Sequence, residues 1–279
     1  MDSEDSKKEA DLDEESIEED HSLSFSSNIY QAELKLFEGY KFGDGVDHQF
    51  KVTSSEYAAH QYADVRGTAN PSLMDKLFWK HMIAVGGGAY GARKTFDDST
   101  DPFEDAKPVW CFNRFGSTRT KLPDGRIVCI GGEHEDFYDP DFYIYNDVVV
   151  ITPAQPGDPP PLLTPQCITI YGYPTTVFPP TDHHSSTYYV DSTTGSEYIF
   201  IIGGQGYSGA ASHERTDVYR LDLSDFSIQR LQTSGACPKG GTCEHNAELL
   251  FIGEEQPTIK ITTKEREVFR LRIHDLIWL

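Results

Sequence analysis

This chain of 279 residues is acidic, with a formal net charge of −21, and 38% of its residues are hydrophobic. The apolar fraction is enough for a sizeable core, but no apolar run approaches the ~20 residues of a membrane span. An acidic protein repels phosphate groups, which argues against nucleic-acid binding. We therefore expect neither membrane association nor a nucleic-acid partner, and a protein partner is the better match.

Much of the negative charge is concentrated at the N-terminus. Residues 1–20 contain eleven acidic residues against Lys7 and Lys8, and a serine-rich stretch follows. Such a segment cannot bury enough apolar surface to offset its ordering entropy, so we predict a disordered tail over residues 1–28. This tail has no basic and apolar regions of a secretory signal, and the five cysteines lack zinc-site spacing. Reduced thiols and a cytoplasmic location are the resulting expectation.

Residues 29–107 predict a hairpin followed by a helical cap. Apolar alternation on both sides of Gly43-Asp44-Gly45 indicates the hairpin, over residues 33–53. Pro71 suits the first turn of a helix whose apolar spacing continues until the three glycines at 86–88. A second short helix is expected over residues 89–96, and an acidic connector over 97–107.

An internal repeat dominates the rest of the chain. An apolar strand ends at Gly131-Gly132, a similar strand ends at Gly203-Gly204, and a β-rich strand follows each pair after a loop. Glycine pairs permit positive φ and a close backbone approach, so we assign Gly131, Gly132, Gly203 and Gly204 a structural role. A third, degenerate copy has Thr262-Thr263 in place of the glycines.

We predict that each copy forms four antiparallel strands, so that residues 108–279 comprise three sheet units. The expected strands are 117–122, 126–130, 148–151 and 167–171 in the first unit, 186–190, 198–202, 218–221 and 228–233 in the second, and 248–251, 258–262, 268–273 and 276–279 in the third.

The pattern of an apolar strand, Gly-Gly and a later aromatic-bearing strand resembles the kelch repeat, whose units are β-propeller blades. The resemblance covers residues 110–235 well and residues 236–279 weakly. It implies a mainly β fold, an incomplete or small kelch-like propeller of about three to four four-stranded blades with a short N-terminal helical segment. Because propellers usually need four to eight blades, such an array would be open, covered by the helices, or completed by a second copy of the chain as a homo-oligomer.

The candidate functional residues lie in an acidic, aromatic loop directly after the first glycine pair. Long loops on a rigid scaffold often bind partners, and aromatic side chains often anchor them. We expect a second long loop, over residues 206–215, to share this role. The predicted partner-binding residues are Glu133, His134, Glu135, Asp136, Phe137, Tyr138, Asp139, Asp141 and Tyr143.

These features favour a non-enzymatic protein–protein interaction scaffold, with no catalytic residue, metal or cofactor assigned. The alternative is a metal-binding protein or kelch-type enzyme that uses the carboxylates of the 133–141 loop, since clustered oxygen ligands suit divalent ions. We expect His183, His184 and His245 to form structural hydrogen bonds between blades. We also expect Arg114, Arg119 and Arg126 to pair with the acids of the 133–141 loop.

Overall fold

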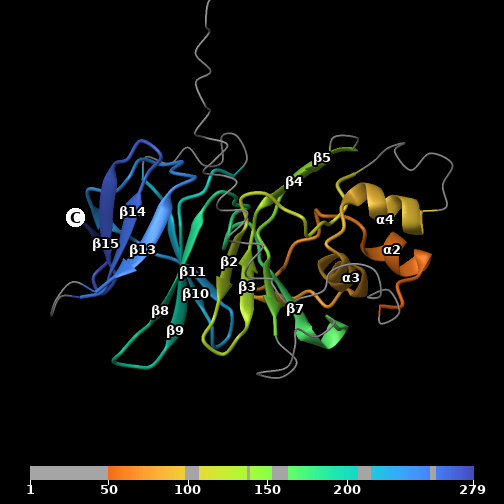
Figure 1. Cartoon of the computed structure of the whole chain (residues 1–279), viewed down its shortest axis with the longest axis horizontal. Coiled ribbons are helices and arrows are strands. Elements are labelled where there is room, and N and C mark those ends of the chain that lie inside the picture. The colour runs from red at the N-terminus through yellow and green to blue at the C-terminus, as the bar shows by residue number, and fades with distance from the viewer. Residues whose placement is uncertain (1–49, 98–106, 137–138, 153–162, 207–214, 252–255) are drawn as a thin grey trace, which may run out of the picture. The chain divides into compact units, whose positions relative to one another are not determined.

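The computed structural model describes residues 50–97, 107–136, 139–152, 163–206, 215–251 and 256–279. The predicted tail over residues 1–28 lies outside this set. Most of the predicted hairpin over residues 33–53 does so too, and its last residues, 50–53, form no strand. Among the described elements strands predominate, and no described helix is long and apolar enough to cross a membrane (Figure 1).

Three helices of the described residues precede the main sheets: α2 (Ser54–His60), α3 (Leu77–Val85) and α4 (Ala89–Phe96). Helix α4 lies where it was predicted, whereas α2 was not predicted. Helix α2 begins where the Thr53 hydroxyl accepts a hydrogen bond from the Glu56 amide at 3.1 Å. Helix α3 ends at Gly86 in the left-handed conformation, with φ +61°, as a terminating glycine should.

The prediction that a helix starts at Pro71 is wrong. Ser72–Leu73 instead form strand β1, and α3 begins six residues after Pro71. The Ser72 hydroxyl accepts hydrogen bonds from the amides of Thr68 and Ala69, both at 2.9 Å, which fixes a turn here. The amide of Met74 then donates a hydrogen bond to the Ile170 carbonyl at 2.8 Å. Pairing with this distant strand therefore overrides the local helical pattern.

Three open sheets follow in chain order, and Figure 1 shows them from green through teal to blue. Strands β1 and β12 were not predicted, and β11 is shorter than the predicted 228–233, whereas every other strand of these sheets lies within two residues of its predicted bounds. Sheet 1 has the order β1-β7-β6-β3-β2, sheet 2 has β11-β10-β9-β8, and sheet 3 has β12-β16-β15-β14-β13. Their strands are β2 (Thr118–Lys121), β3 (Ile127–Ile130), β6 (Val148–Ile151), β7 (Ile168–Gly172), β8 (Ser185–Val190), β9 (Glu197–Ile202), β10 (Val218–Asp222), β11 (Ile228–Arg230), β12 (Ser234–Gly235), β13 (Asn246–Leu250), β14 (Thr258–Thr262), β15 (Val268–Arg272) and β16 (Ile277–Trp278).

Within each sheet the four main strands are antiparallel neighbours in sequence order, as predicted. The only parallel pair among the described strands joins β12 to β16. The first strands of the three units, β2, β8 and β13, lie next to one another, with β8 in contact with both of the others. The fold is therefore mainly β, with three successive antiparallel sheets that are joined along their first strands.

The two glycine pairs occupy equivalent positions in sheets 1 and 2. The amide of Gly131 donates to the Asp147 carbonyl at 3.0 Å, and the amide of Gly203 donates to the Asp217 carbonyl at the same distance. The second glycine of each pair bonds to the segment before the next sheet: Gly132 to Thr181 and Gly204 to Thr242, both at 2.9 Å. Each pair thus connects its own sheet to the following one.

Side-chain hydrogen bonds between the first strands repeat with the same period. His184 lies 2.9 Å from the Thr118 hydroxyl, and His245 lies 2.8 Å from the Ser185 hydroxyl, in each case through Nε2. Burial, with neighbouring histidines contributing at His184, lowers the pKa of His184 to about 3, and burial lowers that of His245 to about 4. Both rings are therefore neutral at pH 7, and these two histidines link sheets as predicted.

The outer sheets differ in how their faces are covered. All of β3 and β6 is buried, and the alternate residues Val128, Ile130, Val148 and Val150 pack in one cluster with sheet 2. In sheet 3, Ile259, Ile261 and Leu271 face sheet 2, whereas Val268 and Arg270 are exposed. Sheet 3 is consequently buried on one face and largely polar on the other.

Replacing Gly203 by alanine should destabilise the protein more than the same change at Gly195. The two glycines have nearly equal φ, +72° and +74°, so the backbone strain is matched. A Cβ at Gly203 would lie 2.2 Å from the Thr242 carbonyl oxygen, whereas a Cβ at Gly195 meets nothing within 4 Å. We expect G203A to lower the free energy of unfolding by about 1–3 kcal/mol more than G195A, measured by urea denaturation. Equal losses would show that the glycine pair is not needed for contact between sheets.

Candidate functional site

The predicted binding loop is a β-hairpin that belongs to none of the three sheets. Strand β4 (Glu133–Asp136) pairs with β5 (Asp139–Ile144), and the hairpin is inserted between β3 and β6 (Figure 1). Seven of the nine predicted residues lie on its strands, whereas Phe137 and Tyr138 lie outside the described residues. Most of the second predicted surface, residues 207–214, also lies outside them.

Several contacts fix the base of the hairpin. Glu133 and Phe115 exchange two backbone hydrogen bonds of 2.8 Å, and His134 Nδ1 lies 2.6 Å from the Asn113 carbonyl oxygen. The Arg66 guanidinium stacks on the Tyr143 ring, 4.7 Å from its centroid, and donates to the Ile144 carbonyl at 2.9 Å. His134 and Tyr143 are buried, so among the predicted residues these two hold the hairpin in place and do not present a surface.

The exposed part of the hairpin combines negative charge with aromatic side chains. Glu135 is exposed, and Phe142 has 44% of its surface accessible. Phe115, which pairs with the base of β4, is 61% exposed. Phe115 and Phe142 were not among the predicted site residues, although Phe115 precedes Gly116 in the segment leading to the repeat. Exposed aromatic residues beside a fixed strand are typical of interaction sites.

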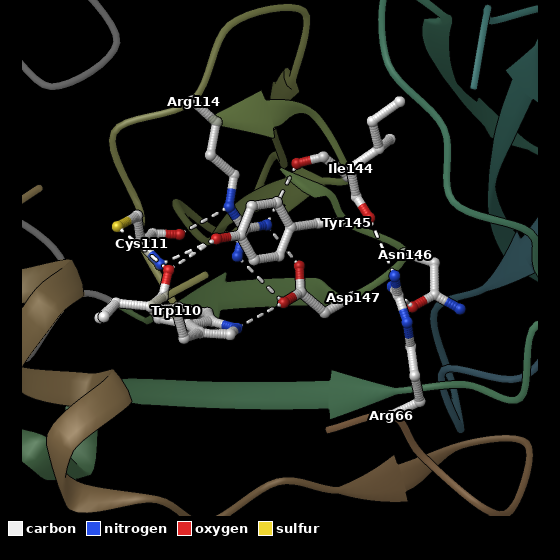
Figure 2. A network of polar contacts seen from close by, with 10 residues as sticks. Arg66, Trp110, Cys111, Arg114, Ile144, Tyr145, Asn146 and Asp147 are labelled. Carbon is white, nitrogen blue, oxygen red and sulfur yellow. Dashed lines mark hydrogen bonds and ion pairs between the residues drawn. The ribbon is translucent and has the colours of Figure 1, made fainter. Parts of the chain in front are cut away.

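A buried polar network lies where the hairpin returns to sheet 1 (Figure 2). Arg114 pairs with Asp147 through both carboxylate oxygens, at 2.5 and 3.0 Å, and donates to the carbonyls of Cys111 and Gly131. Its guanidinium carbon lies 3.4 Å from the centroid of the Tyr145 ring. Trp110 also donates to the Asp147 carboxylate, at 3.0 Å.

We interpret this network as structural, because its ionisable groups keep their usual protonation states. Burial alone would lower the pKa of Arg114, but the Asp147 carboxylate overcomes this effect and raises it. Burial disfavours the charged form of Tyr145 and raises its pKa well above the usual value, so the hydroxyl stays protonated. The expectation that Arg114 pairs with the acids of the hairpin is wrong, and Arg126 pairs with Asp124 at 2.6 Å instead. Sequence proximity favoured the loop acids, but the buried guanidinium needed a buried carboxylate.

A second group of ionisable side chains lies at the base of the hairpin. Glu133 meets Asp182 and His183, which immediately precede β8, and His183 Nε2 is 3.4 Å from Glu133 Oε1. A hydrogen bond from His183 lowers the pKa of Glu133, and the same bond raises the pKa of His183. Burial raises the pKa of Asp182. Glu133 and His183 were predicted separately, in different roles, and Asp182 was not predicted because it is far from Glu133 in the chain.

Repeat position explains why these residues meet. Glu133 directly follows the first glycine pair, and the residues before β8 receive the hydrogen bond of Gly132. The repeat therefore contains the signal for this cluster, because the residue after a glycine pair lies beside the segment before the next first strand. No protein-family model matches the chain, and a search of curated proteins found no match.

The Arg114–Asp147 pair should stabilise the protein far more than the equivalent pair in sheet 2. Asp217 holds the repeat position of Asp147 and pairs at 2.6 Å with Arg230, whose side chain is half exposed. We expect D147N to lower the free energy of unfolding by about 3–5 kcal/mol, because it leaves a buried cation without its partner. D217N should cost about 1 kcal/mol or less. Similar losses in chemical denaturation would contradict the structural role given to the network.

Proposed function

We propose that this chain is a non-enzymatic protein–protein interaction scaffold, built as an incomplete kelch-like β-propeller and binding its partner through the β4–β5 hairpin. The observation that carries the proposal is the hairpin itself, which stands outside the three sheets on a base fixed by buried contacts. A fixed base lowers the entropy lost when a partner binds the exposed part.

The repeated hydrogen bonds support the propeller part of this proposal. Each glycine pair bonds both within its own sheet and to the start of the next unit, and the first strands lie side by side. This is how successive blades are arranged around an axis. The exposed face of sheet 3 carries Lys260 and Arg270 among its partly or fully exposed residues, which suits the polar end of an open array.

The hairpin offers two recognition features together. Its outer strand edges can pair with an extended segment of another chain, and Phe142 gives an aromatic anchor beside the pairing edge. The neighbouring carboxylates, including exposed Glu135, favour a partner with basic residues. We therefore propose a protein partner that presents an extended basic segment.

Site-specific photo-crosslinking tests this proposal. A photoreactive phenylalanine at position 142 should form a discrete protein adduct in cell extract, because Phe142 lies on the proposed surface. The matched control is position 268, since Val268 is 43% exposed and Phe142 is 44% exposed. Excess unlabelled wild-type chain should suppress the adduct at 142. The same adducts at both positions, or none at 142, would contradict binding through the hairpin.

A further inference from the structure

The side chains of Glu133, Asp182 and His183 form a cluster at the base of the β4–β5 hairpin. Each offers one potential ligand atom, and these atoms all lie within 4.8 Å of one another. Ligands about 2.0–2.2 Å from a tetrahedral ion lie about 3.3–3.6 Å apart, so the outermost pair would move about 1 Å closer around an ion. The cluster joins the end of sheet 1 to the start of sheet 2.

The backbone around the cluster is held by hydrogen bonds on every side. The His183 amide donates to the Gly116 carbonyl at 2.7 Å, and the His183 carbonyl accepts from Glu244 at 3.0 Å. Asp182 is only 2% exposed, and one of its carboxylate oxygens accepts a hydrogen bond from the Gly206 amide at 2.7 Å. The potential ligands are thus already placed in the protein without an ion.

Gly116 makes room for the His183 ring. A Cβ at position 116 would lie 2.8 Å from Cδ2 and 2.9 Å from Cγ of His183, closer than side chains approach. His183 itself has φ +50°, a conformation that non-glycine residues seldom adopt. Gly116 and Glu244, which hold the corresponding positions in the other two units, have φ +60° and +51°, so this conformation belongs to the repeat, and at His183 it directs the imidazole toward Glu133.

The two carboxyl groups need something positive between them. Asp182 is buried and its carboxylate lies close to that of Glu133, so two negative charges are not readily accommodated here. A proton, the imidazolium of His183 or a bound cation can each relieve this repulsion. Of these, only a cation uses all three side chains as ligands at once.

The other nitrogen of the ring also has a suitable neighbour. His183 Nδ1 lies 3.8 Å from Oε1 of Glu244, on the side of the ring away from Glu133. Histidine ligands commonly direct their second N–H at a carboxylate, which fixes the tautomer that binds metal through the other nitrogen. The separation of 3.8 Å is longer than a hydrogen bond, so Glu244 would orient the ligand after a small movement of its side chain.

We propose that Glu133, Asp182 and His183 Nε2 bind one divalent first-row transition-metal ion, with Glu244 as a positioning residue. One imidazole and two carboxylates match the donors preferred by Zn²⁺, Co²⁺ or Mn²⁺. Three protein ligands leave room for water on the ion. The ion would tie the first residue of the hairpin to the segment before β8. This site goes beyond the proposed scaffold function and does not depend on it.

Titration of the chelator-treated full chain with Zn²⁺ by calorimetry tests the proposal. We expect one site per chain, and at least tenfold weaker binding in E133Q and in H183N. Asparagine is chosen at position 183 because it tolerates positive φ better than most residues. E135Q, two residues along the same strand and exposed, is the matched control and should bind as the wild type does. E244Q should weaken binding by about 10–100-fold through the orientation of His183.

Absorption spectra with Co²⁺ identify the ligands independently of affinity. Coordination by nitrogen and oxygen, lost in H183N, would support the site. Sulfur-to-cobalt charge-transfer bands would show that cysteines bind the ion and would overturn the proposal. It would equally be overturned if the wild type bound no ion, or if E133Q and E135Q bound with the same affinity. Because E133Q changes a partly exposed side chain, it keeps the test valid if H183N fails to fold.

Discussion

The hydrogen bonds of the two glycine pairs determine how the rest of the structure is arranged. In each pair, the amide of the first glycine donates a hydrogen bond within its own sheet. The amide of the second glycine donates to a carbonyl in the segment before the next sheet. Both residues have positive φ, and a side chain at any of the four positions would lie within 3.0 Å of a neighbouring atom. The spacing of the sheets therefore depends on four residues without side chains, and the apolar clusters between the sheets form around this spacing.

The same connection places the candidate functional residues. Because Gly132 bonds to Thr181, the residue after the pair, Glu133, lies beside Asp182 and His183. The hairpin that starts at Glu133 is consequently fixed at its base by two sheets and by Arg66 from the N-terminal part. The proposed partner-binding surface and the proposed metal site thus meet at one residue, although they have different chemistry and separate tests.

Much of the β structure could be predicted because its signals are local. Runs such as 148–151 and 199–202 are apolar throughout, and the structure shows them buried. The glycine pairs and the interstrand histidines also follow from the repeat alone. Features that depend on distant pairing were not predictable in this way. Ser72–Leu73 pair with β7, Arg114 selects Asp147 over nearer acids, and Asp182 approaches Glu133 across about fifty positions of sequence. Helix α2 has a single buried residue, Tyr57, so it leaves little apolar periodicity to detect.

The most direct test of the account is a disulfide between the first strands of sheets 1 and 2. The hydroxyl oxygens of Thr120 and Ser186 lie 2.7 Å apart, so cysteines at these positions can approach bonding distance with little movement. If the sheets stack as described, oxidised T120C/S186C should form this disulfide and keep the secondary structure of the unmodified chain. Two freely reactive thiols at 120 and 186 in the folded protein, with no crosslink under oxidising conditions, would contradict the stacking of the sheets.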